Sequence, residues 1–461
     1  MRIPAREALA LMTLLALAAA LFARDLGAPS LEFDEGVYLS SADLLARGLS
    51  AGQDVFTSQP PLFFALLDAG GSLVGGDAAG LRALAVVLAL LATLAGWALV
   101  RPIAGPGPAL AAVALLALTP GVADAAAVVS ADVPCIAFGA GALVAARAAR
   151  RRPRWGAVAG ALLVCALATK LLALPFGVAL LAGAVADRPS RAAVLAFAAG
   201  AAGALVAIGA ASFGALGPLW DGAVAFHLDA RGAPEIAGRD PLSIIVLIVA
   251  AYLGVLGVVA VGIARLSRPE IPAWLRARAD LLGLLAGGVL LCALHRPLLH
   301  HHLVVIAWPL AVLGATTLPA RADRRAWALA GGLAALTLPL GLHGRWTVPP
   351  VEQRRLDAAA RLVATHSEPG TPVVSDLPLV ALLAERPAAP ATVDPSYVRV
   401  STGSLDAAAI LRATDGAGAA VVGRSFREVP GLQAAIAARF DRAVAIGPIT
   451  VYLRHATPPP A

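Results

Sequence analysis

The sequence has little charge, one lysine and few cysteines. Only 14% of its 461 residues are charged, whereas 59% are hydrophobic. Soluble domains carry about 25% charged residues, so this composition excludes an ordinary soluble protein and requires lipid as part of the solvent. The cysteines, Cys135, Cys165 and Cys292, lie inside apolar runs without metal-ligand spacing. We therefore expect no disulfide and no cysteine metal site, and the sequence indicates no other metal or cofactor.

The net charge is positive, at +7. Such an excess can indicate a nucleic-acid partner, but here the arginines stand in short clusters between apolar runs, as topology signals do. Binding to nucleic acid is therefore not expected. Membrane lipids are the expected surroundings.

The N-terminus has two features of a secretory signal peptide. Arg2 and Arg6 precede an apolar run, and Ala-Leu-Phe-Ala resembles a cleavage site. The apolar run extends to residue 23, and a protein with many spans needs no cleaved leader. A signal anchor is therefore the favoured interpretation.

Apolar runs long enough to cross a hydrocarbon core of roughly 30 Å recur up to about residue 342. They predict a polytopic α-helical membrane protein with about eleven transmembrane helices, at about 8–23, 82–100, 108–123, 133–148, 156–170, 171–186, 193–212, 242–264, 281–294, 298–318 and 326–342. The stretch 60–74 is apolar but short, and counting it as a span would invert every later loop. We interpret it as a re-entrant or surface-lying helix.

Arginine sets the predicted orientation, because cytoplasmic loops are enriched in basic residues. The densest cluster lies within 147–154, and others lie at 188–191, 265–278 and 321–325. Placing these clusters in the cytoplasm puts the N-terminus inside a plasma (inner) membrane. The opposite, extracytoplasmic face then holds 24–59, 124–132, the turn at Lys170, 213–240 and 295–302.

The C-terminal part has a different pattern. Three β-rich runs, at 372–375, 419–422 and 450–453, alternate with helical patterns at 356–365, 405–413 and 432–440. We therefore expect a transmembrane domain over residues 1–343 and a small extracytoplasmic α/β domain over 344–461. No phosphate loop or nucleophile elbow occurs in it, which favours a cap over an independent catalytic domain.

Several polar residues of the predicted outer face have no topological role. Asp34 and Glu35 follow the first span, where a positioned carboxylate can act as a general base or can simply face solvent. Gln59 precedes Pro60-Pro61, which predicts a rigid turn. Asp132 opens a span and is either an N-cap, a functional acid or both.

Basic groups complete this set. Lys170 lies in a tight turn between two apolar spans, where an ammonium either binds an anion such as a lipid phosphate or snorkels to the interface. The run His295, Arg296, His300, His301 and His302 begins another span. Consecutive histidines diverge around a helix, so one or two lining a polar cavity beside Arg296 are expected rather than a metal cluster.

The order of these features resembles the C-type glycosyltransferase superfamily, in particular the bacterial relatives of protein O-mannosyltransferases and lipid A aminoarabinose transferases. The resemblance rests on Phe33-Asp34-Glu35-Gly36, on Gln59-Pro60-Pro61-Leu62, on Asp132, on Thr169-Lys170 and on the soluble tail.

This resemblance implies an inverting transfer of a sugar from a polyprenyl-monophosphate donor to a glycan, lipid or protein acceptor. Asp34 matches the catalytic aspartate of the family, and Glu35 matches its neighbour. The family often has lysine or histidine where this chain has Gln59, which can hydrogen-bond a phosphate but not neutralise it. Arg296 or Lys170 is the expected source of that charge.

Two other classes of protein stay open. A secondary transporter would place its ionisable sites near the bilayer midplane and often has repeated halves, but here the candidates gather at one face and no repeat is evident. A non-catalytic membrane assembly protein would not need Asp34.

The predicted threading can be tested by cysteine labelling in a background that lacks the three native cysteines. A cysteine at Asp54, in the predicted outer loop 24–59, should react with an impermeant reagent applied to intact cells. A cysteine at Arg152 should react only after permeabilisation, because the two loops are predicted to lie on opposite faces. Labelling of the Arg152 position from outside would overturn the threading.

Overall fold

The computed structural model describes residues 3–24, 26–27, 32–232, 241–265, 267–296, 298–319, 328, 331–332 and 350–454. The chain divides into two compact units. The helical unit comprises Met1–Leu26, Arg82–Ser212 and Gly238–Arg345, and the mixed unit comprises Gly27–Leu81, Phe213–Ala237 and Trp346–Ala461. Apart from residues 328 and 331–332, the last predicted span (326–342) lies outside the described residues, as does the arginine cluster at 321–325.

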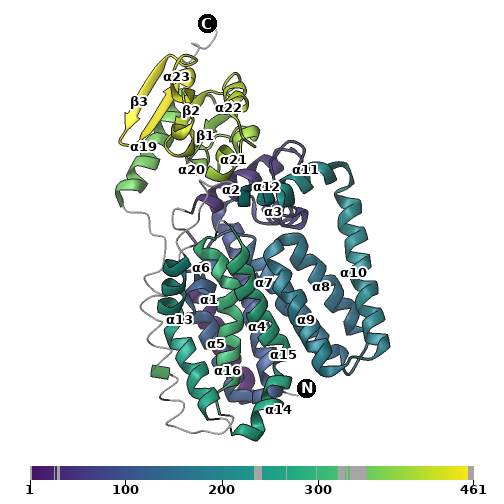
Figure 1. The fold of residues 1–461 in the computed structure, drawn as a ribbon. Coiled ribbons are helices and arrows are strands. Elements are labelled where there is room, and N and C mark those ends of the chain that lie inside the picture. Colours follow the sequence, from purple (N-terminus) through teal and green to yellow (C-terminus); the bar gives the residue numbers. More distant parts are fainter. Residues whose placement is uncertain are drawn as a thin grey trace. The chain divides into compact units, whose positions relative to one another are not determined.

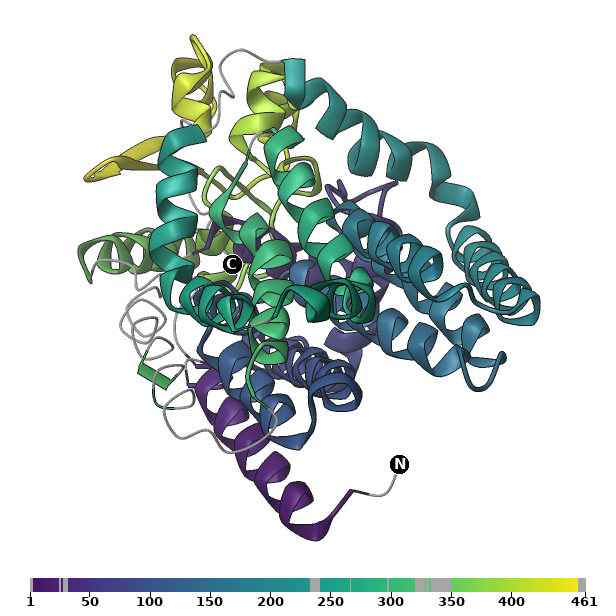
Figure 2. The same ribbon diagram turned by 60° about the horizontal axis from the view of Figure 1, so that its bottom comes forward.

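The helical unit is an all-α bundle (Figures 1 and 2). Its helices are α1 (Ala5–Phe22), α4 (Ala78–Ala104), α5 (Pro106–Leu118), α6 (Pro120–Ala126), α7 (Asp132–Ala149), α8 (Trp155–Thr169), α9 (Leu174–Asp187), α10 (Arg191–Ala211), α13 (Pro241–Ala264), α14 (Ile271–Ala277), α15 (Ala279–Leu294) and α16 (Val304–Thr316). The residues of α16 are all buried, because α5, α13 and α15 surround it. Trp308 fills the centre of this packing.

Each predicted span up to residue 318 falls on a helix or a bent pair of helices. Within the described residues, 4 helices are long and apolar enough to cross a membrane, or up to 6 if each bent pair is one span. The others, such as α8, α9 and α15, are apolar but shorter than the roughly 20 residues that a straight crossing needs. The total of about eleven therefore stays a prediction.

One of the bent pairs was not predicted. Helices α5 and α6 meet at an angle of 67°, within the predicted span 108–123. Thr119 is extended and Pro120 begins α6. A proline lacks the amide that would continue the helix, so the chain turns at this position.

Glycines allow α8 and α10 to pack very closely. A Cβ atom at Gly160 would lie 2.1 Å from the carbonyl oxygen of Phe197, and one at Gly200 would lie 1.9 Å from that of Ala157. Small residues permit such contacts between apolar helices, where lipid supplies no hydrophobic driving force. The two helices therefore form one rigid layer.

The mixed unit combines helices with one sheet. Its helices are α2 (Phe33–Ala46), α3 (Pro61–Val74), α11 (Leu216–Trp220), α12 (Phe226–Gly232), α19 (Pro350–His366), α20 (Pro378–Leu383), α21 (Tyr397–Ser401), α22 (Ala407–Ala413) and α23 (Leu432–Ala437). Its strands are β1 (Val373–Ser375), β2 (Ala419–Val422), β3 (Arg442–Ile446) and β4 (Ile449–Leu453).

The four strands have the order β1-β2-β4-β3. β1 and β2 are parallel, and β4 is antiparallel to both β2 and β3. Gly447, with φ of 59°, closes the β3–β4 hairpin in the left-handed region that glycine favours. Strands β1, β2 and β4 coincide with the predicted β-rich runs, whereas β3 was not predicted.

The mixed unit joins segments that are far apart in sequence. Leu44 and Val55 share a hydrophobic core with Val373, Val421 and other residues of the C-terminal segment. A Cβ atom at Gly36 would lie 3.0 Å from Leu379, and Ser40 Oγ donates a 3.4 Å hydrogen bond to the carbonyl of Pro378. Helix α2 is therefore built onto α20.

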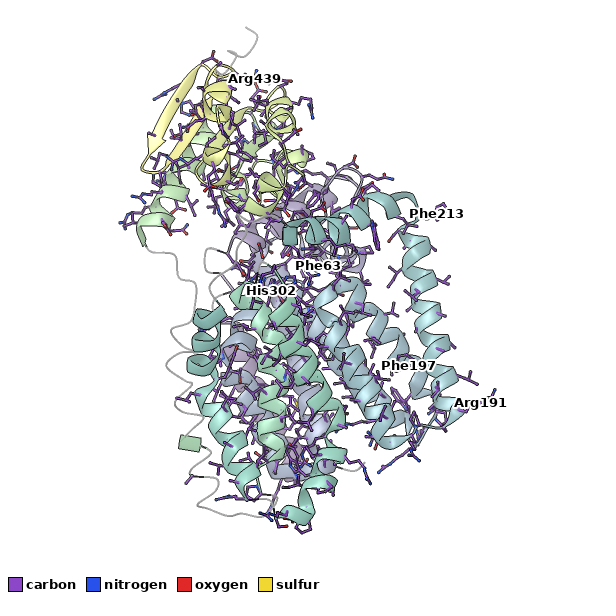
Figure 3. The ribbon with its side chains drawn as sticks, in the orientation of Figure 1. Phe63, Arg191, Phe197, Phe213, His302 and Arg439 are labelled. Carbon is purple, nitrogen blue, oxygen red and sulfur yellow. The ribbon has the colours of Figure 1, made fainter. Side chains whose placement is uncertain are left out.

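Helix α3 also belongs to the mixed unit. It begins at Pro61, as the two prolines predict, and Phe63 packs against Tyr38 of α2 with ring centroids 4.7 Å apart (Figure 3). By contact, then, this stretch is a partner of α2. Its position at the membrane surface stays a prediction.

Candidate active site

Asp34 and Glu35 lie in the first turn of α2. Carboxylates are stabilised at this end of a helix by the unpaired amides and the helix dipole. Glu35 is fully buried, while Asp34 is partly exposed. The sequence placed both beside the first span, but in the structure their position is set by α2, which packs on the C-terminal segment.

An arginine of that segment, exposed but with part of its side chain packed against protein, lies beside this turn. The guanidinium carbon of Arg424 is 4.1 Å from the centre of the Phe33 ring. Burial lowers the pKa of Arg424, and the largest electrostatic attraction that opposes this effect comes from Asp34. Asp376, Asp394 and Glu428 add further attraction. Asp34 thus has a fixed cation as its neighbour.

Asp376 fixes the turn that carries Arg424. Its carboxylate accepts hydrogen bonds from the backbone amides of Gly423 at 2.7 Å, Arg424 at 2.7 Å and Phe426 at 2.9 Å. Burial raises the pKa of Asp376, and the three amides oppose that rise by stabilising its ionised form. The backbone on both sides of Arg424 is therefore held in place.

The sequence reasoning missed both Arg424 and Asp376. A signal was available, because Asp376 directly follows β1 and Gly423-Arg424 directly follow β2. β1 and β2 are parallel neighbours, so their carboxyl ends meet at one edge of the sheet, where open α/β sheets commonly place functional groups.

Gln59 lies in the same unit. It is buried, and its Nε2 donates a 3.2 Å hydrogen bond to the hydroxyl of Tyr38. This bond ties the start of α3 to α2. The carboxamide of Gln59 carries no charge, so a phosphate would gain only hydrogen bonds from its NH₂ group.

Asp132 and Lys170 form a buried ion pair in the helical unit. Lys170 Nζ lies 2.8 Å from each carboxylate oxygen of Asp132. Both side chains are buried, so the ammonium does not snorkel to solvent. Asp132 makes no side-chain cap, since the N-cap of α7 is Ala131; the N-cap interpretation was therefore wrong. Among the described residues, the ammonium has no other side-chain partner.

The segment before Asp132 holds two further buried polar atoms, one in α6 and one in the turn that follows it. Asp124 Oδ1 and Ser130 Oγ have no hydrogen-bond partner among the described residues. Buried polar atoms are usually satisfied, so an orphaned pair in one short segment is typical of a place where water or a ligand binds.

The histidine segment is also in the helical unit. His302 is buried, its Nδ1 accepts a 3.2 Å hydrogen bond from the amide of Leu299, and its ring contacts those of His295 and His301. Arg296 is exposed and donates to the carbonyls of Ala293 and His295, which end α15. The side chain of His300 lies outside the described part of the structure.

The predicted site residues therefore form two groups. Asp34, Glu35 and Gln59 are in the mixed unit, and Asp132, Lys170, His295, Arg296 and the other histidines are in the helical unit. Within each unit the structure brings members of the group together. Asp34 attracts the guanidinium of Arg424 electrostatically, and Lys170 forms an ion pair with Asp132.

Comparisons with known proteins agree with this arrangement. Residues 58–212 match the family model described as dolichyl-phosphate-mannose-protein mannosyltransferase. No curated protein matches the sequence.

Solved structures share the fold. ArnT from Cupriavidus metallidurans, bound to undecaprenyl phosphate, is 15% identical with a TM-score of 0.65, covering 97% of this chain and 98% of that one. The Archaeoglobus fulgidus oligosaccharyltransferase is 13% identical with a TM-score of 0.56, covering 90% and 69%. The arabinofuranosyltransferase AftD from mycobacteria is 16% identical with a TM-score of 0.55, covering 97% of this chain and 40% of AftD.

The chain thus shares its fold with these three proteins. Together with the family match over residues 58–212, this confirms the resemblance to the C-type glycosyltransferase superfamily that was predicted from the sequence.

The ion pair of Lys170 makes a testable prediction. Lys170→Met should lower the stability of the purified protein by about 3–5 kcal/mol, because it leaves Asp132 as an unpaired buried charge. The double variant Lys170→Met/Asp132→Leu should recover most of this loss. Thermal unfolding in detergent measures both effects, with Arg276→Gln as an exposed control. A Lys170→Met protein as stable as the parent would show that the pair does not form.

Proposed function

We propose that this chain transfers a sugar from a polyprenyl-phosphate-linked donor to an acceptor at the extracytoplasmic face, with inversion at the anomeric carbon and Asp34 as the general base. The observation that carries the proposal is the setting of Asp34. Its carboxylate is partly exposed in the first turn of α2, and it gives the largest electrostatic attraction on the nearby Arg424.

The setting suits proton abstraction. A nearby cation favours the ionised form of a carboxylate, which is the form that accepts a proton, and Arg424 supplies this cation beside Asp34. Asp34 takes the proton of the acceptor hydroxyl while the hydroxyl oxygen bonds to the anomeric carbon. The bond from that carbon to the phosphate oxygen breaks, and polyprenyl phosphate leaves with the electron pair. Glu35, the next residue in the same turn, is fully buried.

Two further observations support the donor class. Lys170 places two N–H groups on Asp132, and its third proton is available for a phosphate oxygen, since no other described side chain uses it. Gln59 and Arg296 provide hydrogen bonds, and Arg296 adds a positive charge. The related fold of ArnT was solved with undecaprenyl phosphate, and an Archaeoglobus fulgidus oligosaccharyltransferase with a dolichol-phosphate and a peptide. The acceptor class here is a glycan, a lipid or a protein.

The proposal is tested first by comparing the surface glycans and lipids of a deletion strain with those of its parent by mass spectrometry. A loss of one sugar from a glycan, lipid or protein identifies donor and acceptor together. An unchanged profile would favour a secondary transporter or a non-catalytic assembly protein instead.

Asp34→Asn keeps the shape of the side chain and removes its basicity. We expect turnover to fall roughly a hundredfold or more, the scale of general-base catalysis, while the lipid donor still binds. Donor binding and single-turnover transfer by the purified protein separate the two effects. Near-normal turnover would show that Asp34 is not the base, and Asp132 would be the next candidate.

Arg424→Gln should lower kcat more than it changes the KM for the donor. The acid limb of the pH–activity profile of this variant should move to higher pH, because the ionised carboxylate of Asp34 loses the cation that favours it. Arg424→Lys should restore part of the activity, since it keeps the charge. Arg412→Gln, an exposed arginine of the same segment, is the matched control. If the pH–activity profile of Arg424→Gln superimposes on that of the parent, Arg424 has no electrostatic effect on Asp34.

A further inference from the structure

The helical unit contains a wedge-shaped cavity between consecutive helices. Helix α8 packs mainly on α7 and α10, whereas α9 packs mainly on α15, so α8 and α9 diverge although only a short turn joins them. A cavity of about 360 Å³ lies between the two layers, within the range of small-molecule pockets. Its walls include Leu163, Leu180 and Phe197 (Figure 3).

Charged residues form the rim of this cavity. Arg150 and Asp187 form an ion pair there, and Arg147 donates to both carboxylate oxygens of Asp280 at 2.7 Å. These four residues line the cavity. Each acidic group at the rim is therefore already neutralised by an arginine.

Unpaired arginines continue the rim. Arg151, Arg152 and Arg154 lie in the short turn between α7 and α8, which joins Arg150 to Gly156, and both of those residues line the cavity. All three are exposed and have no acidic partner in the described part of the chain. Arg188 and Arg191 are also exposed, on the connection from α9 to α10 beside Pro189, another lining residue. The rim therefore has a clear excess of positive charge.

The cavity is separate from the Lys170 site. Lys170 ends α8, and the arginine-rich turn begins it. The 15 residues of α8 span about 22 Å at 1.5 Å per residue. The rim and the Asp132–Lys170 pair thus lie at opposite ends of one helix, and the arginine bias predicts that the rim end faces the cytoplasm.

We propose that this cavity binds an anionic glycerophospholipid, with an acyl chain in the wedge and the phosphate of its headgroup among the unpaired arginines. An apolar slot between membrane helices suits an acyl chain. Basic pockets between helices on the cytoplasmic side suit anionic headgroups, because that leaflet is rich in them. A lipid in this position fills the gap between the α8–α10 layer and the α9–α15 layer, so it stabilises the helical unit independently of any sugar transfer.

The headgroup is tested with two double variants of the full-length protein. Arg151→Gln/Arg152→Gln removes two rim charges, and Arg268→Gln/Arg276→Gln removes two exposed charges from another loop of the same predicted face. Native mass spectrometry should show phosphatidylglycerol retained over phosphatidylcholine by the parent and the control. Retention by the rim variant should fall roughly fivefold for each arginine removed. Equal losses in both double variants would indicate general membrane electrostatics and overturn the site.

The acyl chain is tested by filling the wedge. Gly177 lines the cavity, and a Cβ atom there would meet nothing within 4 Å. Gly177→Leu should therefore fold, but it should lose phosphatidylglycerol and the stabilisation by that lipid. Gly203→Leu on α10, which also has open space but does not line the cavity, should keep both. Unchanged lipid retention in Gly177→Leu would overturn the proposal, as would displacement of the bound lipid by polyprenyl phosphate alone.

Discussion

The helical unit depends on one constraint, which is that a charge buried among apolar helices must have a partner. Three described ion pairs meet it. Glu7 binds Arg101, Asp280 binds Arg147, and Asp132 binds Lys170. Two pairs join helices that are distant in sequence, α1 with α4 and α7 with α15, and the third joins the consecutive helices α7 and α8. Removal of one partner would leave an uncompensated charge. These pairs therefore fix which helices are neighbours, a choice that apolar packing alone specifies poorly in lipid.

The mixed unit satisfies the same constraint with backbone amides. Asp376 is fully buried, and three amides of the turn after β2 surround its carboxylate. This turn presents Arg424 to the start of α2. A parallel pair of strands is the simplest way to bring these two segments together, because their carboxyl ends meet at one edge.

Much of the local structure could be predicted from the sequence, and long-range pairing could not. Apolar length placed the helices, and β-rich runs placed three strands. Strand β3 was missed because its five residues include two alanines and are largely exposed, so they carry little β signal. Asp132 and Lys170 were each singled out, but their ion pair depends on how α7 and α8 pack. Arg424 was missed because the sequence separates it from Asp34 by nearly the whole chain.

The mixed unit contains both N-terminal and C-terminal segments, and this changes the role expected for the C-terminal segment. The sequence favoured a cap over the site, and a cap need only cover what the membrane domain has already built. Here the segment that follows α1 shares a hydrophobic core with the C-terminal one, through Leu44 and Val55. Since α2 packs on α20 and its first turn lies beside Arg424, residues beyond 370 set the position of Asp34 and supply a cation near it. A chain without that segment would keep its apolar helices but would lose the scaffold of its candidate base.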